Sequence, residues 1–409
     1  MINIIAFHCV PYDVDPNVEN FWILLSERLR LLGRNLILIT TTEIYSNNIE
    51  YVQVPFKITE YHSLDCAATN TISNATEIKS IQNWYKCGFE EAVARLLVCE
   101  NLFKKLFNEL NPSAVISWQS ANPISRLVRR LCLDMDLPWW CAERGWINDT
   151  LMLDLSENNR LSEVTTSFAL NRIYYQYKSK PDLYENIKAR LVKGKSTARY
   201  AEKKCTSEEN IRKLYEIPAA SKIFVLFTHG EPHLNALDNK LTINHSMDSD
   251  GLELKIKSIA HAISLNNDYL IIKEHPFNSL YDSEINMESF DCKNIIMSKL
   301  EGVDQLLFQG NYFLFTCSTI QFNAALMDKR FGLLSRGLLS GPDMAPFVDD
   351  FNSIEDFLNC IKNKNDWVKR NEEVKKMICF LFDYCLLDIS PDNSSASSEE
   401  LAKHLAIYN

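Results

Sequence analysis

The hydrophobic positions of the chain alternate between short apolar runs and longer stretches with a helical period. Residues 2–7 and 36–40 are short apolar runs typical of buried strands. Between them, apolar residues repeat at helical spacing over residues 17–32, and Gly33 follows as a stop signal. A strand, a helix and a strand within about 40 residues predict an open and mostly parallel sheet.

The alternation continues and then pauses. Further strands are predicted at residues 114–118 and 137–141, with helices at 77–110 and 123–134. Residues 156–220 differ, because they are polar, helical in pattern and rich in lysine and arginine. This basic segment could meet an anionic acceptor or a lipid surface, but a solvated helix pair is the simpler interpretation.

Strand and helix patterns restart at residue 221. The predicted strands of this half lie at residues 223–227, 269–272, 294–297, 312–316 and 331–334, and the predicted helices at 251–265 and 318–327. Ser353, three residues before Asp356, is typical of a helix N-cap. A long helix is predicted at 366–387, followed by the polar run SPDNSSASSEE, which we expect to be a linker with little to bury.

These patterns predict an α/β chain with two Rossmann-like domains. We expect an N-terminal domain at residues 1–155, a helical inter-domain segment at 156–220, a C-terminal domain at 221–365, and a terminal helix with a polar tail at 366–409. In open α/β sheets, ligands bind outside the carboxyl ends of the strands. Polar residues that directly follow apolar runs are therefore the candidate site residues.

Composition and charge exclude several classes of protein. The chain has 409 residues, of which 46% are hydrophobic and 23% charged, so a largely disordered chain is excluded. The formal net charge of −10 argues against a general nucleic-acid binder, and we predict no nucleic-acid partner. The sequence contains neither the G-x-G-x-x-G pattern nor a P-loop, which disfavours dinucleotide and P-loop chemistry.

Cysteine usage and hydropathy bear on location. None of the 12 cysteines forms a C-x-x-C pair, and several lie in apolar runs, as buried thiols do in a reducing compartment. The first residues lack the basic start of a signal peptide. The apolar run at 377–389 contains two aspartates and is shorter than the ~20 residues of a membrane span. We expect a cytoplasmic protein that can work at the inner face of the membrane.

A first polar group follows the predicted strand at 137–141. It reads Glu143-Arg144-Gly145-Trp146. The glycine would let the backbone turn sharply, so that Glu143 projects from the strand end as a general acid or base. The alternative is an ordinary corner in which Glu143 pairs with Arg144 or Arg126.

A second polar group follows the strand at 223–227. It contains His229, Glu231, His233, Asn235 and Asp238. A metal site would use the two histidines, but Pro232 prevents a helical i, i+4 presentation. We therefore favour a catalytic loop and predict no metal ion.

Two more groups follow later strands. Lys273 precedes His275-Pro276, and the proline would hold the imidazole outward to donate to a phosphate oxygen. A turn histidine satisfied by its neighbours is the alternative. Ser318 and Thr319 join a strand to a helix, where hydroxyls and free backbone N–H groups favour an anion.

The order of these motifs across two α/β halves resembles GT-B glycosyltransferases that use CMP-activated acidic sugars. Within that group the chain most resembles bacterial capsule and O-antigen β-Kdo transferases, over residues 137–337. Their Glu-Asp-Gly-Phe segment and following strand are similar to 143–146 and 151–154, their His-Pro to 275–276, and their Ser-Thr helix start to 318–326.

The chain departs from this family at three places. Arg144 stands where the family has aspartate, and Asn323 where it has glutamate before Ala-Leu. Retaining members also carry an aspartate after the first strand of the second half. Here the nearest residues are Asn235, which is not a nucleophile, and Asp238, which is shifted by three positions.

The resemblance implies a GT-B fold with two domains facing a cleft, the first for the acceptor and the second for the nucleotide sugar. It implies catalytic roles for Glu143 and Asp238, with Asn235 as the alternative position. Implied nucleotide contacts are Lys273, His275, Pro276, Ser318 and Thr319, and other cleft residues are Arg144, Gly145, His229, Glu231 and His233. No cofactor is implied, because the CMP-sugar is itself the substrate.

The function implied is transfer of Kdo from CMP-Kdo to a surface polysaccharide or glycolipid of a bacterium. The acceptor would be a glycan or a lipid-linked glycan, with peripheral membrane association. Two alternatives remain open. Bacterial polysialyltransferases share the motif order and use CMP-sialic acid, and Asn235 leaves room for a non-catalytic, export-associated glycan-binding protein.

Overall fold

The computed structural model describes most of the chain and divides it into two compact units. Unit 1 comprises Met1–Ser167 and Tyr384–Asn409, and unit 2 comprises Phe168–Asp383. The described residues are 2–7, 16–40, 49–54, 77–78, 81–82, 85, 87–118, 123–155, 168–193, 210–228, 249–273, 294–298, 302–316, 318–335 and 337–407.

Unit 1 is built on a seven-stranded sheet in its described part. The strand order is β12-β6-β5-β4-β1-β2-β3. Five strands run parallel: β1 (Ile2–Phe7), β2 (Arg34–Thr40), β3 (Glu50–Gln53), β4 (Pro112–Trp118) and β5 (Trp139–Arg144). The strands β6 (Thr150–Asp154) and β12 (Leu386–Asp388) pair antiparallel, β6 with β5 and β12 with β6. The central strands are buried on both faces, which explains their continuous apolar runs.

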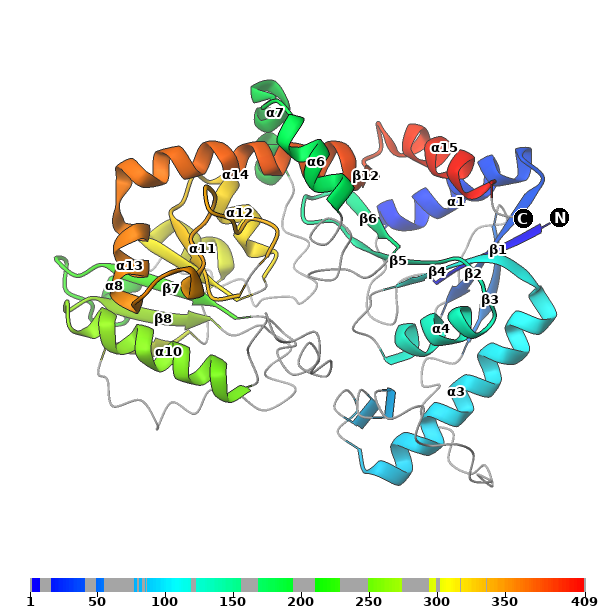
Figure 1. The fold of residues 1–409 in the computed structure, drawn as a ribbon, viewed down its shortest axis with the longest axis horizontal. Helices are drawn as coiled ribbons and strands as arrows, with labels where there is room; N and C mark the ends of the chain where they lie inside the picture. Colours follow the sequence, from blue (N-terminus) through cyan, green and yellow to red (C-terminus); the bar gives the residue numbers. More distant parts are fainter. Residues whose placement is uncertain are drawn as a thin grey trace. The chain divides into compact units, whose positions relative to one another are not determined.

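Helices cover both faces of this sheet. Figure 1 shows α1 (Pro16–Leu31) and α15 (Ser394–Leu405) on one face, and α3 (Phe89–Leu110) and α4 (Pro123–Asp134) on the other. The predicted stop after the first helix is confirmed. Gly33 has a φ of +75°, a left-handed conformation that favours glycine after a helix.

The C-terminal tail is not the linker that its polar composition predicts. Residues 394–405 form α15, and Leu386–Asp388 add strand β12 to the sheet of unit 1. Ser394 and Ser398 are fully buried, as is Ser26 on α1, which packs along α15. Serine is small enough to let two helices approach closely, so tertiary packing overrides a composition that is typical of a linker.

Unit 2 contains a fully parallel sheet in its described part. Its strands are β7 (Ile223–Phe227), β8 (Tyr269–Lys273), β9 (Ile295–Met297), β10 (Tyr312–Phe315) and β11 (Phe331–Leu333). They lie in the order β11-β10-β7-β8-β9. The first five strands of unit 1 follow the same order when counted along the chain. The predicted α/β class, and the two Rossmann-like units that the GT-B fold requires, are confirmed.

The helices of unit 2 follow from that strand order. They are α6 (Phe168–Gln176), α7 (Pro181–Lys193), α8 (Ile211–Leu214), α10 (Ser249–Ser264), α11 (Val303–Gln309), α12 (Ile320–Leu326), α13 (Ile354–Lys362), α14 (Lys364–Tyr384) and the short 3-10 helix η7 (Val348–Asp350). The crossover from β7 through α10 to β8 and the crossover from β10 through α12 to β11 run in opposite directions along the sheet. Because such crossovers are right-handed, α10 and α12 lie on opposite faces of this sheet. The predicted N-cap of α13 is confirmed, because Ser353 Oγ accepts from the Asp356 N–H at 3.1 Å.

The chain passes from one unit to the other after Ser167 and after Asp383. The predicted domain boundaries lie at residues 155, 220 and 365. The helical segment at 168–193 packs within unit 2, where Tyr174 and Tyr177 lie edge-on against Phe380 of α14. Lys188 is ion-paired with Asp328 at 2.6 Å. The segment is therefore part of a packed unit, and some of its basic side chains already have acidic partners.

Gly332 on β11 tests the packing of this unit. A Cβ atom there would lie 2.5 Å from Ile361 Cδ1 and 2.6 Å from Phe357 Cζ, two buried side chains of α13. We expect Gly332→Ala to lower the free energy of unfolding by about 1–3 kcal/mol through overpacking, measured by urea denaturation. Gly337→Ala is the matched control, since its Cβ would meet the nearest atoms at an ordinary 3.7 Å. Equal midpoints for both variants would contradict the packing described here.

Candidate functional site

Hydroxyl side chains mark the carboxyl edge of the sheet in unit 2. Thr228 directly follows β7, Ser298 follows β9, Thr316 follows β10, and Ser335 lies two residues after β11, all of them buried. Backbone hydrogen bonds continue one residue past the strands, from Thr228 N to Lys273 O at 3.1 Å and from Thr316 N to Phe227 O at 3.3 Å. The described residues of this edge are therefore polar and joined by backbone hydrogen bonds.

This edge contains a topological switch point. From β7 the chain proceeds outward to β8 and β9, whereas β10 and β11 extend the sheet from the other side of β7. The crevice at such a reversal, outside the carboxyl ends of the strands, is the usual ligand site of a doubly wound sheet. In unit 2 the reversal lies between Thr228 and Thr316.

Three of the predicted nucleotide contacts are described, and all three lie at or just after the carboxyl end of a strand at this edge. Lys273 is the last residue of β8 and is half-buried, and Ser318 is buried just after β10. Ser318 Oγ accepts from the Ile320 N–H at 3.3 Å, as expected for a hydroxyl that precedes a helix. Thr319 is exposed and its side chain forms no capping hydrogen bond. Their role in binding stays a prediction.

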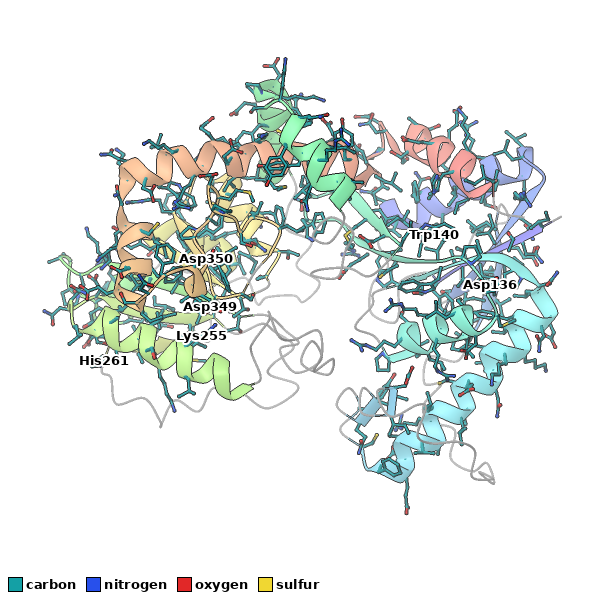
Figure 2. The ribbon with its side chains drawn as sticks, in the orientation of Figure 1. Asp136, Trp140, Lys255, His261, Asp349 and Asp350 are labelled. Carbon is teal, nitrogen blue, oxygen red and sulfur yellow. The ribbon has the colours of Figure 1, made fainter. Side chains whose placement is uncertain are left out.

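The loop after β11 is held in place by two basic side chains. Arg370 Nη1 donates to the carbonyl oxygens of Pro342 and Met344, each at 2.9 Å. Lys255 on α10 is ion-paired with Asp349 at 2.7 Å, and Figure 2 shows these two side chains beside each other. The loop that carries Gly337 is thus fixed from two helices.

Asp366 orients the arginine that holds this loop. Arg370 Nε donates to Asp366 Oδ2 at 2.9 Å, and this hydrogen bond lowers the pKa of the Asp366 carboxyl. Cys360 Sγ lies 3.1 Å from the same oxygen, and burial, with the carboxylate beside it, raises the pKa of Cys360 to about 11. Cys360 is therefore a protonated donor at neutral pH rather than a reactive thiolate.

Glu143 and Arg144 lie at the carboxyl edge of the sheet in unit 1. The pairing of β4 with β5 ends at Trp118 and Ala142, so β5 extends two residues further. Those two residues pair instead with the antiparallel strand β6. Glu143 is half-buried there, where a carboxylate can keep its charge and still contact a substrate.

Gly145 is required for a different reason from the predicted sharp turn. Its φ is not in the left-handed region. A Cβ atom at this position would lie 2.0 Å from Thr150 Oγ1 and 2.9 Å from Leu386 Cδ2. The glycine allows the backbone to pass close to β6 and β12, with Gly145 N donating to Thr150 O at 2.8 Å.

The remaining predicted site residues lie outside the described residues: His229, Glu231, His233, Asn235, Asp238, His275 and Pro276. The pairing of Glu143 with Asp238 therefore stays a prediction. Within the described part of the chain, no three His, Cys, Asp or Glu side chains are grouped as metal ligands would be. No helix in that part is long and apolar enough to cross a membrane.

Sequence reasoning missed two polar residues at the edge of unit 2. Gln321, in the first turn of α12, and Ser335, after β11, are both buried. Gln321 is the only glutamine in an otherwise apolar stretch from 320 to 322, which is a faint signal. Ser335 gives none, because a serine after a strand is usually exposed.

Comparison with known proteins finds only distant similarity. No protein-family model matches the chain, and neither does any curated protein. Among solved structures, a glycosyltransferase from Rickettsia africae is 12% identical, with 100% of this chain and 99% of that one covered and a TM-score of 0.39. The UDP-GlcNAc 2-epimerase of Methanocaldococcus jannaschii is also 12% identical, with 99% of each chain covered and a TM-score of 0.38.

A third solved structure is similar over part of the chain. KpsC of Thermosulfurimonas dismutans, a β-Kdo 2,4 transferase, is 12% identical, with 55% of this chain and 69% of that one covered and a TM-score of 0.34. These identities and TM-scores carry no argument about activity.

Acidification should loosen the support of the loop after β11. Because the folded-state pKa of Asp366 is lowered from its ordinary 3.8, its contribution to stability is present above that value and is lost as the pH falls through the lowered pKa. We expect the difference in urea midpoint between wild type and Asp366→Asn to be full at about pH 6 and to shrink below about pH 4.

Arg370→Gln is the control for this experiment. In the Arg370→Gln background, which lacks the guanidinium, adding Asp366→Asn should change the urea midpoint only slightly, and the change should not vary with pH. The opposite result is a difference in urea midpoint between wild type and Asp366→Asn that stays constant down to about pH 3. That result would show that the hydrogen bond between Arg370 and Asp366 does not stabilise the fold.

Proposed function

We propose that this protein is a glycosyltransferase that moves Kdo from CMP-Kdo to a bacterial surface polysaccharide or glycolipid. The observation that carries the proposal is the polar edge of unit 2, where Lys273 and Ser318 lie at or just after the carboxyl ends of strands on the two sides of β7. An edge of this kind at a switch point suits a nucleotide. The motif order along the chain is what narrows the donor to a CMP-sugar.

The nucleotide end of the donor needs groups that stabilise negative charge. When the glycosidic bond to CMP breaks, charge develops on the phosphate that leaves. We assign Lys273, Ser318 and His275 to this phosphate, where a cation and hydrogen-bond donors would stabilise it in the transition state. Such a set of side chains can act without a metal ion.

The sugar end needs a group that handles a proton. We assign Glu143 to the acceptor hydroxyl, from which a half-buried carboxylate could take a proton as the new bond forms. We assign Asp238 to the second carboxylate, which would face the oxocarbenium-like centre. A glycan or lipid-linked acceptor, and peripheral association with the membrane, complete the proposal.

The decisive experiment is CMP release by the purified protein. CMP-Kdo, CMP-sialic acid and UDP-N-acetylglucosamine are offered in turn with acceptor glycan, and free nucleotide is measured. We expect release from CMP-Kdo, and we expect it to survive EDTA. Release from CMP-sialic acid instead would favour the sialyltransferase alternative.

Two other outcomes would overturn the proposal. Tight CMP binding with no release from any donor would favour the non-catalytic glycan-binding alternative. Activity that disappears on chelation and returns with Mg²⁺ or Mn²⁺ would contradict the metal-free phosphate site and point to His229, His233 or Asp238 as ligands.

Glu143→Gln tests the acid–base assignment. Loss of the ionisable group should slow single-turnover transfer by about 10²–10⁴-fold with donor binding unchanged, since a positioned acid or base contributes that much. Glu109→Gln, at an exposed position on α3 of the same unit, is the matched control and should retain the wild-type rate. A near-normal rate for Glu143→Gln would exclude this residue as the base.

The second carboxylate is tested in the same assay. We expect Asp238→Asn to lose turnover as well. If Asp238→Asn stays active while Asn235→Asp gains activity, position 235 is the one that faces the anomeric carbon. The native chain would then be a weakened or non-retaining variant.

A further inference from the structure

Three buried polar atoms at the carboxyl edge of unit 2 have no hydrogen-bond partner among the described residues. They are Thr316 Oγ1, Gln321 Oε1 and Ser335 Oγ. The three residues are only 6%, 5% and 6% exposed, so water does not readily replace the missing partners. Most buried polar groups in folded proteins are satisfied, and three exceptions at one edge need an explanation.

The chain topology brings these three side chains to one place. Thr316 and Ser335 follow the neighbouring parallel strands β10 and β11, and Leu334 N donates to Phe315 O at 2.8 Å just before the strands end. Neighbouring strands lie about 4.8 Å apart. The amide group of Gln321 lies 3.7 Å from the ideal Cβ position of Gly337, two residues after Ser335.

The surroundings keep the three groups in position. Phe315 and Phe322 are buried next to Thr316 and Gln321 in the chain, so neither backbone can swing outward without exposing an aromatic ring. The loop after Ser335 is held by the hydrogen bonds of Arg370 described above. Leaving a buried acceptor unpaired costs more stability than a hydrogen bond returns, and a fixed group cannot relieve that cost by moving.

The chemistry of the three groups selects the ligand. A glutamine oxygen can only accept hydrogen bonds, and threonine and serine hydroxyls can accept or donate. An ionised phosphate only accepts, so it cannot satisfy Gln321 Oε1. A ring that carries several hydroxyl groups offers both donors and acceptors, so it can satisfy all three oxygens.

We propose that Thr316, Gln321 and Ser335 form a subsite, here called the hydroxyl subsite, for a ring of the donor that carries hydroxyl groups. The ring is either the ribose of the nucleoside or the transferred sugar. The identity of the donor rests on the function proposed above, whereas the need for a hydroxyl-bearing ligand rests on the three unpaired oxygens. The hydroxyl subsite is distinct from the phosphate contacts assigned to Lys273, His275 and Ser318.

The first test uses the free protein and needs no ligand. Thr316→Val replaces an unpaired buried hydroxyl by a methyl group of the same shape. We expect the thermal unfolding midpoint to rise, because the cost of burying an unpaired hydroxyl disappears. Ser258→Ala is the control, since that exposed hydroxyl already donates to Leu254 O at 2.9 Å. A lower midpoint for Thr316→Val would mean that the hydroxyl has a structural partner, and it would overturn the proposal.

The second test measures ligand affinity by calorimetry for wild type, Thr316→Val and Gln321→Leu. The probes are cytidine, which has the ribose but no phosphate, and free Kdo. We expect each variant to weaken one probe by about two- to tenfold, the equivalent of one neutral hydrogen bond. A loss of affinity for cytidine identifies the ribose as the ring that binds the subsite, and a loss of affinity for Kdo identifies the transferred sugar. Binding of neither probe to wild type, or equal affinities in all variants, would overturn the proposal and leave ordered water as the partner.

A third comparison separates this subsite from the proposed activity. His275→Ala should weaken CMP and leave cytidine unchanged, whereas a ribose-binding subsite predicts that Thr316→Val weakens both by the same factor. If no donor is turned over but Thr316→Val still weakens cytidine or Kdo, the glycosyltransferase proposal fails and the hydroxyl subsite stands. If Thr316→Val weakens CMP alone, the three groups bind phosphate and the hydroxyl subsite is wrong.

Discussion

The candidate site in unit 2 depends on a constraint of parallel sheets, which is that all strands end at the same edge. Once β7, β8, β9, β10 and β11 are aligned in parallel, every residue that follows a strand is brought to one side of the sheet. The reversal between β7 and β10 makes this edge a topological switch point, which is the usual ligand site of such a sheet. Residues as far apart in sequence as Thr228 and Ser335 are thereby brought to one edge of the sheet.

The same constraint explains how much of the fold could be predicted. Strands buried on both faces read as continuous apolar runs, so β7 and β10 could be placed from the sequence to within a residue. Lys273 and Ser318 could be placed at strand ends for the same reason. The helix α15 could not, because it is buried by packing along α1, which lies far away in the chain.

The parts of the site that could not be predicted are those that depend on missing partners. Gln321 and Ser335 are ordinary residues in the sequence, and they are notable only because their side-chain oxygens Oε1 and Oγ are buried without a hydrogen-bond partner. Gly145 is a related case. The sequence indicates a need for glycine, but the cause is the approach of Thr150 from the paired strand rather than a turn. Features of this kind belong to tertiary contacts and leave no local pattern.

Ion pairing changes how the basic segment of the chain should be understood. Burial alone would raise the pKa of Asp328, but the hydrogen bond from Lys188 and the charge of Lys375 outweigh it and lower that pKa. Asn371 also donates to the same carboxylate. These lysines serve the packing of α7 and α14 within unit 2. A basic surface for an anionic acceptor would therefore have to come from other residues of the segment.

The two sheet edges differ in a way that suits a division of labour between the units. The edge of unit 1 carries the ionisable residues Glu143 and Arg144, and both are only half-buried. A group that must gain or lose a proton cannot be buried deeply without losing its charged form. The edge of unit 2 has the half-buried Lys273, but its buried groups, such as Thr316 and Gln321, are neutral and keep their chemistry when water is excluded. This difference is consistent with the roles proposed above, which are proton transfer by Glu143 and recognition of a hydroxyl-bearing ring by Thr316 and Gln321.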